Sequence, residues 1–365
     1  MHSPPLARAC PALESHPAVS WYVPDDTTDT EELDAWCRAT GPVVIDSVPY
    51  RQFGELLEGD SLAVLVWNIA AGSGEILTVI RDELGFDCET GYALNSRGPH
   101  FVMLLQEALR VSADVPPTEP DLQIPPAVVE FDRPGPRLGI VEVARRCGLA
   151  LSYVPATRNG TAEYDGLRED KGNAILSTLP LSDFIGIEAP MVAQRRVSAG
   201  ATVHGPQGDS LRLVSAHINT FPGPWRTLVT GASSRLRQSL SIVDALRRAE
   251  LERAGAARES LAGCYPYCSD EETAEYLIST ITAGDFNTGS DHETALLHLR
   301  ENFPDSPPSH GQHTSRSFPT DHLLFRHNYD YGNEPDRILE GTYRRLGSKY
   351  NSDHYPLIAW FRFGG

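Results

Sequence analysis

The sequence contains no long apolar run. The longest one, Leu62–Ala71, is interrupted by Asn68 and is far shorter than the roughly 20 residues that a membrane-spanning helix needs. The first thirty residues contain neither the basic start nor the apolar core of a secretory signal. We therefore expect no transmembrane segment and predict a location in the cytoplasm.

Closely spaced cysteines are almost absent. Of the six cysteines, only Cys264 and Cys268 lie near each other. A structural zinc site needs two such pairs, or one pair with nearby histidines, and the sequence offers no second pair. We expect free thiols in a reducing cytoplasm, with a local Cys264–Cys268 disulfide as the alternative for an exported protein.

Lysine is nearly absent, since only Lys171 and Lys349 occur in the chain. The formal net charge is −18, with 49 acidic against 31 basic residues. Such acidity argues against broad adhesion to nucleic acid or to an anionic membrane. It leaves room for a local basic cleft, so a nucleic acid partner is possible but is not favoured by the net charge.

The chain divides by composition at about residue 60. Residues 1–60 form an acidic, Pro-rich N-terminal extension, in which residues 30–38 have the pattern of a single helix. We predict that residues 1–24 are dispensable for activity. Residues 61–365 have the composition of one large globular domain. The sequence specifies no oligomeric state.

The second part has an α/β pattern. Two stretches are typical of amphipathic helices, Ile76–Leu84 and Ser234–Leu251, the second with Leu236, Leu240, Val243 and Leu246 on its expected buried face. Short runs rich in Val, Ile and Leu have the length and composition of strands: Leu62–Trp67, Phe101–Leu105, Ala174–Leu179, Ala199–Val203, Leu211–Ala216, Ile278–Ala283, His322–Phe325 and Tyr355–Phe363. Strands that are apolar throughout indicate a sheet system covered by helices.

Polar side chains that bind hard cations or transfer protons stand at the ends of these predicted strands. They are Asn68, Glu107, His217, Asp285 with Asn287, Asp321, and Asp353 with His354. A single polar strand end is ordinary, because strands end at the surface. Repeated Asp, Glu, Asn and His at six ends indicate a site. Oxygen ligands of this kind suit Mg²⁺, Mn²⁺ or Ca²⁺.

The same motifs resemble those of the endonuclease/exonuclease/phosphatase superfamily. In chain order they are Trp67-Asn68, Leu105-Gln-Glu107, Gly172-Asn-Ala-Ile-Leu-Ser177, Ser215-Ala-His217, Gly284-Asp-Phe-Asn287, Asp321-His-Leu-Leu-Phe325 and Ser352-Asp-His354. The resemblance covers about residues 61–363. It implies a DNase I-like fold, which is a two-layer β-sandwich flanked by helices, and hydrolysis of phosphate esters with a divalent metal, usually Mg²⁺.

The resemblance also implies roles for individual residues. Glu107, Asn68 and Asp353 resemble the metal-binding group, with Glu107 as its main carboxylate. The remaining residues resemble the catalytic group: Asp285 and Asn287, which position the attacking water and a phosphate oxygen, His354 beside the scissile phosphate, Asp321 as the partner that polarises His354, and His217 as a second histidine. A base, a cation and cationic imidazoles are what hydrolysis of an already anionic diester needs.

The sequence departs from the family pattern at one point and leaves others open. Ala70 stands where some branches have an acid, so a second metal position is not implied, and Tyr164 has no convincing phosphate-binding motif. Arg195 and Arg196 face either phosphate or an ion-pair partner. His292, Glu293 and His298 resemble a zinc-protease motif, but a separation of six residues places the two histidines on different faces of a helix.

The sequence thus predicts a metal-dependent phosphoesterase that hydrolyses phosphodiester bonds by attack of an activated water. A catalytically silent binding module on the same fold is the alternative from another class. Within the enzyme class, an endonuclease, a sphingomyelinase-like enzyme and an inositol-phosphate phosphatase remain open. The partner is a phosphate-ester substrate in each case.

Overall fold

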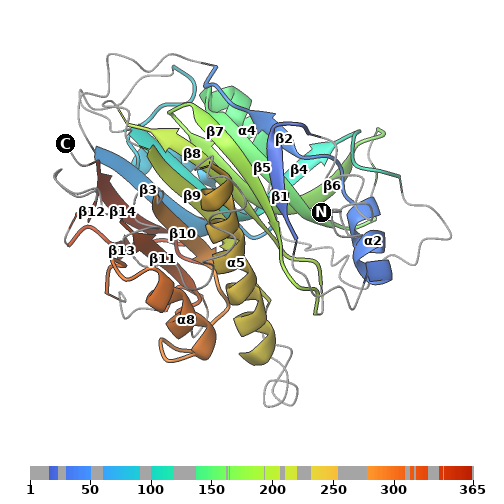
Figure 1. Cartoon of the computed structure of the whole chain (residues 1–365). Coiled ribbons are helices and arrows are strands. Elements are labelled where there is room, and N and C mark those ends of the chain that lie inside the picture. Colours follow the sequence, from blue (N-terminus) through green and yellow to red (C-terminus); the bar gives the residue numbers. More distant parts are fainter. Residues whose placement is uncertain are drawn as a thin grey trace.

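A computed structural model of the chain describes residues 16–23, 30–50, 61–90, 100–117, 137–161, 163, 165–192, 194–205, 210–219, 232–253, 278–308, 313–315, 318–327, 337–339 and 341–363. Two β-sheets lie face to face, and helices cover their outer faces (Figure 1). This architecture confirms the two-layer β-sandwich flanked by helices, and the eight predicted strands are all present. No described helix is long and apolar enough to cross a membrane.

Sheet A is the six-stranded layer. From edge to edge it contains β1 (Val19–Tyr22), β7 (Leu181–Glu188), β8 (Val197–His204), β9 (Ser210–His217), β10 (Ser279–Asp285) and β11 (Asp321–Arg326). Strands β9 and β10 are parallel, whereas β11 runs antiparallel to β10. The end of β9, the end of β10 and the beginning of β11 therefore lie at the same edge of the sheet.

Sheet B is the eight-stranded layer. Its order is β12 (Arg337–Ile338), β14 (Leu357–Arg362), β3 (Ser61–Asn68), β4 (His100–Ser112), β6 (Arg168–Ser177), β5 (Ala150–Arg158) and β2 (Val44–Asp46), and β13 (Arg344–Arg345) pairs with β14. The central strands β3 and β4 are parallel neighbours, and Asn68 at the end of β3 pairs with Gln106 inside β4, which continues to Ser112. The prediction that Glu107 stands at a strand end is therefore wrong, because the pairing of β4 with β6 resumes beyond it.

Strand β3 shows why the predicted strands are apolar throughout. Leu62, Val64 and Val66 pack between the two sheets, whereas Ala63, Leu65 and Trp67 pack on the outer face beneath helices. Both faces of the strand are buried, so the sequence has no polar alternation.

Helices cover the outer face of each sheet. The helices α3 (Ile76–Asp82) and α4 (Ile140–Cys147) pack on sheet B. The helices α5 (Ala232–Arg253) and α8 (Thr294–Asn302) pack on sheet A, side by side in Figure 1. Helix α3 buries the apolar face that the sequence predicts.

The predicted buried face of α5 is only partly right. Val243 and Leu246 are buried together with Ile242, but Leu240 is 45% exposed. The buried face also includes a polar residue, Gln238, whose Nε2 donates to the carbonyl of Pro190 at 3.0 Å. Apolar residues alone therefore do not define the face that this helix buries.

The described residues before position 60 are built into both sheets. Strand β1 pairs in parallel with β7, and β2 pairs with β5. The ring of Trp21 lies over Gly186, where an added Cβ would lie 2.5 Å from the ring. The helix α2 (Thr30–Arg38) matches the predicted helix and buries Trp36. The division of the chain at residue 60 stays a prediction, and the residues before it contribute one edge strand to each sheet.

Two cysteines that are remote in sequence form a disulfide. Cys88 follows α3, Cys147 ends α4, and the two bond to each other across a separation of 59 residues. Cys37 is disulfide-bonded as well. The prediction of free thiols is therefore wrong for these three residues, because the packing of α3 and α4 on one sheet face brings together cysteines whose spacing carries no signal. Cys264 and Cys268 lie outside the described residues.

Candidate active site

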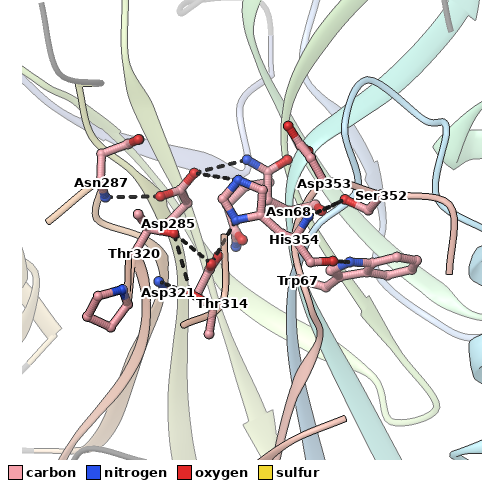
Figure 2. Close-up of polar contacts among 12 residues, drawn as sticks. Trp67, Asn68, Asp285, Asn287, Thr314, Thr320, Asp321, Ser352, Asp353 and His354 are labelled. Carbon is pink, nitrogen blue, oxygen red and sulfur yellow. Dashed lines mark hydrogen bonds and ion pairs between the residues drawn. The ribbon is translucent and has the colours of Figure 1, made fainter. Parts of the chain in front are cut away.

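The strand ends of both sheets converge at one edge of the sandwich. His217 at the end of β9 pairs with Asp285 at the end of β10, and Asp285 also pairs with Asp321 at the start of β11. Asn68 reaches the same point from β3 of the facing sheet, and His354 joins it from the segment before β14 (Figure 2). The structure thus brings these five predicted site residues together.

Asp285 occupies the centre of this group. Its Oδ2 accepts a hydrogen bond from Nδ2 of Asn68 at 3.0 Å, and its Oδ1 accepts from the backbone N–H of Asn287 at 2.9 Å. The same Oδ2 lies 3.5 Å from Nε2 of His217 and 3.7 Å from Nε2 of His354. One buried carboxylate therefore faces an amide and two imidazoles.

The environment of Asp285 raises its pKa to about 7. Burial is the largest cause, because it disfavours the charged form, and the charge of Asp321 acts in the same direction. The charge of His354 and the hydrogen bonds from Asn68 and Asn287 oppose the rise. A carboxylate with this pKa can take up a proton near neutral pH.

Asp321 and His354 form a hydrogen-bonded pair. Oδ2 of Asp321 lies 2.7 Å from Nδ1 of His354 and also accepts from the hydroxyl of Thr320 at 3.0 Å. Burial alone would lower the pKa of His354, but the charges of Asp321 and Asp285 outweigh it and raise the pKa to about 10. Burial would raise the pKa of Asp321, yet the charge of His354 and the hydrogen bonds lower it. The pair is therefore an imidazolium with a carboxylate.

The backbone around His354 is fastened to the end of β3. The hydroxyl of Ser352 donates to the carbonyl of Asn68 at 2.6 Å and accepts from the backbone N–H of His354 at 3.1 Å. The indole Nε1 of Trp67 donates to the carbonyl of His354 at 3.0 Å. Figure 2 shows this segment beside Trp67 and Asn68. The motifs Trp67-Asn68 and Ser352-Asp-His354 are thus two sides of one contact.

Glu107 stands at an irregularity in β4. The pairing of β4 with β6 shifts between Leu105 and Ala108, and Glu107 has φ +52°, a conformation that costs energy for a residue other than glycine. The shift interrupts the alternation of side chains at this position. Among the described residues, Glu107 has one ion-pair partner, Lys171, whose Nζ lies 3.4 Å from Oε2.

The donors around Glu107 fit a hard divalent cation. The distance to Lys171 exceeds the 2.7–2.9 Å that is typical of a charge-assisted hydrogen bond, so the carboxylate oxygens keep acceptor capacity. Asn68 lies beside Gln106 on the neighbouring strand. Within the described part of the chain its Oδ1 accepts a single hydrogen bond, from the N–H of Ala70 at 3.0 Å. A carboxylate and an amide oxygen are ligands that Mg²⁺ accepts.

The third predicted ligand, Asp353, lies next to His354. The carbonyl of Asp353 accepts from Nζ of Lys349 at 2.6 Å, and its charge helps to raise the pKa of His354. Donor atoms of Asp285, Asp321 and His354 also lie within 4.8 Å of one another. A protonated imidazole cannot bind a cation, so this second group suits proton chemistry better than a metal.

Asn287 is held by its backbone and its side chain. Its N–H donates to Asp285, and its Nδ2 donates to the carbonyl of Ile218 at 3.0 Å. Gly284 begins this motif because a Cβ there would lie 1.9 Å from the carbonyl oxygen of Ala216. The turn from Gly284 to Asn287 can therefore pass close to β9.

The sequence analysis missed the role of a second set of polar residues that joins the two sheets behind the site. Gln106 donates through Nε2 to the hydroxyl of Ser215 at 2.9 Å, and that hydroxyl donates to the carbonyl of Leu105 at 2.9 Å. Asn173 donates to the carbonyl of Val197 at 2.6 Å. Gln106, Asn173 and Ser215 all belong to the motifs quoted above, so membership in these motifs could have identified them.

Arg195 and Arg196 are neighbours in sequence but have different partners in the structure. Arg195 forms a buried ion pair with Glu188 at 2.8 Å, so its role is structural. Arg196 is buried at the site, where its Nη1 lies 3.1 Å from Nδ1 of His217. Burial lowers the pKa of Arg196 to about 10, and the charges of Glu107 and Asp285 oppose this. Arg196 therefore belongs to the site because it contacts His217, a contact that the sequence around Arg196 does not predict.

The apparent zinc-protease motif has a structural explanation. Glu293 pairs with Arg235 of α5 and accepts from the N–H of Gly289 at 2.9 Å. It precedes α8, which contains His298. Tyr164 lies outside the described residues.

Comparisons with known proteins find structural likeness only. No protein-family model matches the chain, and no curated protein shows significant sequence similarity. Among solved structures, an endonuclease/exonuclease/phosphatase from Beutenbergia cavernae is 16% identical, with 84% of this chain and 72% of that chain covered and a TM-score of 0.44. A sphingomyelinase C from Streptomyces griseocarneus is 15% identical, with 82% and 99% covered and a TM-score of 0.38. Truncated TDP2 from Caenorhabditis elegans is 13% identical, with 83% and 98% covered and a TM-score of 0.39.

The chain resembles the endonuclease/exonuclease/phosphatase superfamily at two levels. Its motifs occur in the family's order, and its strands form a two-layer sandwich with those motifs at one edge.

Proposed function

We propose that this protein is a divalent-metal-dependent phosphodiesterase. The observation that carries the proposal is the position of Asp285, whose carboxylate meets Asn68 of one sheet and the Nε2 atoms of His217 and His354 within 3.7 Å. Such a constellation offers one proton acceptor beside several hydrogen-bond donors, which is what attack of water on a phosphodiester needs.

Each residue of the site has a distinct role in the proposed reaction. Asp285 orients the attacking water with Asn287 and accepts its proton as the water oxygen bonds to phosphorus. His354, kept protonated by Asp321, donates from Nε2 to a phosphoryl oxygen, and His217 donates beside it. The ester P–O bond breaks, and the leaving alcohol takes a proton from solvent. The products are a phosphomonoester and an alcohol.

Glu107, Asn68 and Asp353 are the residues that we propose for the cation. A bound Mg²⁺, or Mn²⁺ or Ca²⁺ in its place, would offset the charge of the phosphate and polarise its P–O bonds. The fit rests on the oxygen donors of Glu107, at the irregularity in β4, and of Asn68, which ends β3 and pairs with Gln106.

Hydrolysis of bis(p-nitrophenyl) phosphate tests the proposal. We expect turnover with Mg²⁺ or Mn²⁺, loss of turnover with EDTA, and loss in Asp285→Asn, a variant that keeps the shape of the side chain. A folded wild-type protein that is inactive with Mg²⁺, Mn²⁺ and Ca²⁺ would favour the silent binding module instead. Duplex DNA, single-stranded RNA, sphingomyelin and inositol phosphates then separate an endonuclease from a sphingomyelinase-like enzyme and an inositol-phosphate phosphatase.

We also infer that the protein works in an oxidising compartment rather than in the cytoplasm. The support is the Cys88–Cys147 disulfide together with the bonded state of Cys37, since disulfides persist mainly outside reducing compartments. Fractionation of the native host, with non-reducing peptide mapping of each fraction, tests this location.

A further inference from the structure

Two cations lie against one aromatic ring beside the candidate site. Tyr355 follows His354 directly, and its ring centroid lies 4.0 Å from Cζ of Arg345 and 5.0 Å from Nζ of Lys349. The backbone N–H of Tyr355 donates to the carbonyl of Thr314 at 2.8 Å. The main chain at Tyr355 is thus held in place, and both cations contact its ring.

Neither cation has a carboxylate partner within the part of the chain that the structure describes. Nη1 of Arg345 donates to the carbonyl of His313 at 2.8 Å, and Nζ of Lys349 donates to the carbonyl of Asp353 at 2.6 Å. The buried Nε of Arg345 has no hydrogen-bond partner among the described residues. Backbone carbonyls and an aromatic ring do not neutralise these charges, so two like charges contact the same ring at an electrostatic cost.

This pairing is unusual for the composition of the chain. The net charge is −18, and the chain has only two lysines. Both lysines lie at the site: Lys171 contacts Glu107, and Lys349 contacts Asp353. A protein this acidic has many carboxylates with which to pair its cations, yet Arg345 and Lys349 are left for another anion.

We propose that Arg345 and Lys349 form a subsite for a second phosphate group of the substrate, next to the phosphodiester that is cleaved. Arg presents N–H donors that suit phosphate oxygens, and Lys adds a compact point charge. Because Lys349 and Tyr355 flank Asp353 and His354, the subsite adjoins the scissile bond. The inference rests on the proposed phosphodiesterase and narrows its substrate class to diesters that carry a neighbouring phosphate.

Two matched substrates test the subsite. The first is p-nitrophenyl thymidine phosphate, which has a single phosphate, and the second is the same compound with an added phosphate on the other sugar hydroxyl. We expect the wild type to prefer the second through a lower KM. Arg345→Gln should raise the KM for the second substrate about ten-fold, the size of one charge-assisted contact, while kcat and the kinetics of the first substrate stay unchanged. Lys349→Gln should raise the KM for the second substrate by more than that for the first, because Lys349 also holds the carbonyl of Asp353.

Arg344→Gln is the matched control, since Arg344 is the exposed neighbour of Arg345 in β13 and contacts neither the ring nor Lys349. Arg345→Lys keeps the charge and separates its effect from loss of packing on Tyr355. Competition with oligothymidylate and with inositol hexakisphosphate then distinguishes a nucleic acid strand from a phosphorylated small molecule as the source of the second phosphate.

The outcomes separate the two proposals. Hydrolysis of both substrates with equal KM in the wild type, or equal effects of the variants on both, overturns the subsite and leaves the phosphodiesterase standing. Failure to hydrolyse either substrate, or bis(p-nitrophenyl) phosphate, with any of the three metals overturns the proposed function, and the subsite inference falls with it.

Discussion

Arg196 donates a hydrogen bond from Nη1 to Nδ1 of His217 at 3.1 Å. A guanidinium has no acceptor, so Nδ1 of His217 must be the unprotonated nitrogen. Burial, followed by the charges of Arg196, Lys171 and His354, holds the pKa of His217 well below its usual value. His217 is therefore neutral, and its proton sits on Nε2, which faces Oδ2 of Asp285 at 3.5 Å.

Replacing Arg196 should remove the constraint that keeps the proton of His217 on Nε2. In Arg196→Met, Nδ1 of His217 loses its donor, and we expect a mixture of tautomers and a loss of activity on the order of 10-fold to 100-fold. The measurement is the ¹⁵N shifts of His217 in histidine-labelled protein, assigned with His217→Gln. Arg195→Met is the matched control: it breaks the ion pair with Glu188 and lowers stability, but it should leave the His217 shifts unchanged. Unchanged shifts in Arg196→Met would contradict the assigned tautomer.

Glu107→Gln tests the principal cation ligand. The change removes the charge and keeps the shape, so Mg²⁺ affinity should fall at least ten-fold and activity should fall with it, while the fold survives because Glu107 is half-buried at a strand irregularity. Calorimetric titration with Mg²⁺ alone gives the affinity. A folded variant with wild-type affinity would show that Glu107 is not the ligand. Glu169→Gln, at the other end of the β4–β6 pair, serves as the control.

The Asp321–His354 pair should govern the pH dependence. The carboxylate of Asp321 raises the pKa of His354, so Asp321→Asn lowers that pKa and shifts the pH–rate profile toward lower pH. His354→Ala should cost at least ~10²-fold in rate, and Asp321→Asn should cost less. The double variant should be little worse than His354→Ala, because the two act as a unit. Multiplicative losses would show that the pair does not act together.

The same pair should stabilise the fold within a defined pH range. The folded pKa of His354, about 10, lies above its ordinary value of 6.5, so its contribution is complete below about pH 6.5 and is lost as the pH rises through 10. The folded pKa of Asp321 is lowered, so its contribution is lost only in acid. Urea denaturation from pH 6 to 10 should show a steeper alkaline loss in the wild type than in His354→Gln. Equal slopes would contradict a protonated His354.

Removal of β1 should destabilise the protein. Deletion of residues 1–15 should leave activity within a few-fold, but deletion of residues 1–24 also removes Trp21 and Tyr22. The hydroxyl of Tyr22 donates to Glu252 of α5 at 2.7 Å, and its ring is buried. The longer deletion should cost about 4 kcal/mol of the free energy of unfolding, from lost apolar burial, which revises the prediction that residues 1–24 are dispensable. Equal urea midpoints for the two truncations would show that β1 contributes nothing.

Loss of the Cys88–Cys147 disulfide should weaken the fold without changing the site. The bond closes a loop with a sequence separation of 59 residues, for which the chain-entropy account gives about 4 kcal/mol. Cys88→Ala with Cys147→Ala should lower the urea midpoint accordingly, and activity at low temperature should be retained. Reductant added to this double variant measures the combined effect of breaking the disulfide of Cys37 and any further one outside the described residues. Ready alkylation of Cys88 in unreduced protein would contradict the bond.

Sequence reasoning predicted the strands that are apolar on both faces and missed those that are not. Strand β3 is recognisable because Leu62 to Trp67 is uniformly apolar. Strand β5 includes Pro155 at an irregularity in its pairing with β6, and β7 includes Asp183 and Gly186. Gly186 depends on tertiary structure, because it makes room for the ring of Trp21, a residue that lies far earlier in the sequence.

The site residues likewise divide into those that the sequence pattern could predict and those that it could not. Residues that end a predicted strand, such as Asp285 and Asn68, could be chosen because each stands beside an apolar run. Arg196 could not be distinguished from Arg195, since only the fold decides which guanidinium faces His217 and which faces Glu188. Arg345 and Lys349 carried no signal either, because their relation to Tyr355 depends on contacts between β13 and the segment that precedes β14.

The place of β1 has a consequence for the order in which the protein can be assembled. The ribosome makes β1 before any of its neighbours, yet β1 pairs only with β7, which is synthesised after β3 to β6. Until β7 is made, β1 has no described strand to pair with and no sheet to join. Contacts between such distant segments slow folding, and an open strand edge invites pairing with other chains. During synthesis there is therefore a stage in which β1 has been made but remains unpaired, because β7 has not yet been made. Chaperones that shield strand edges would act at that stage.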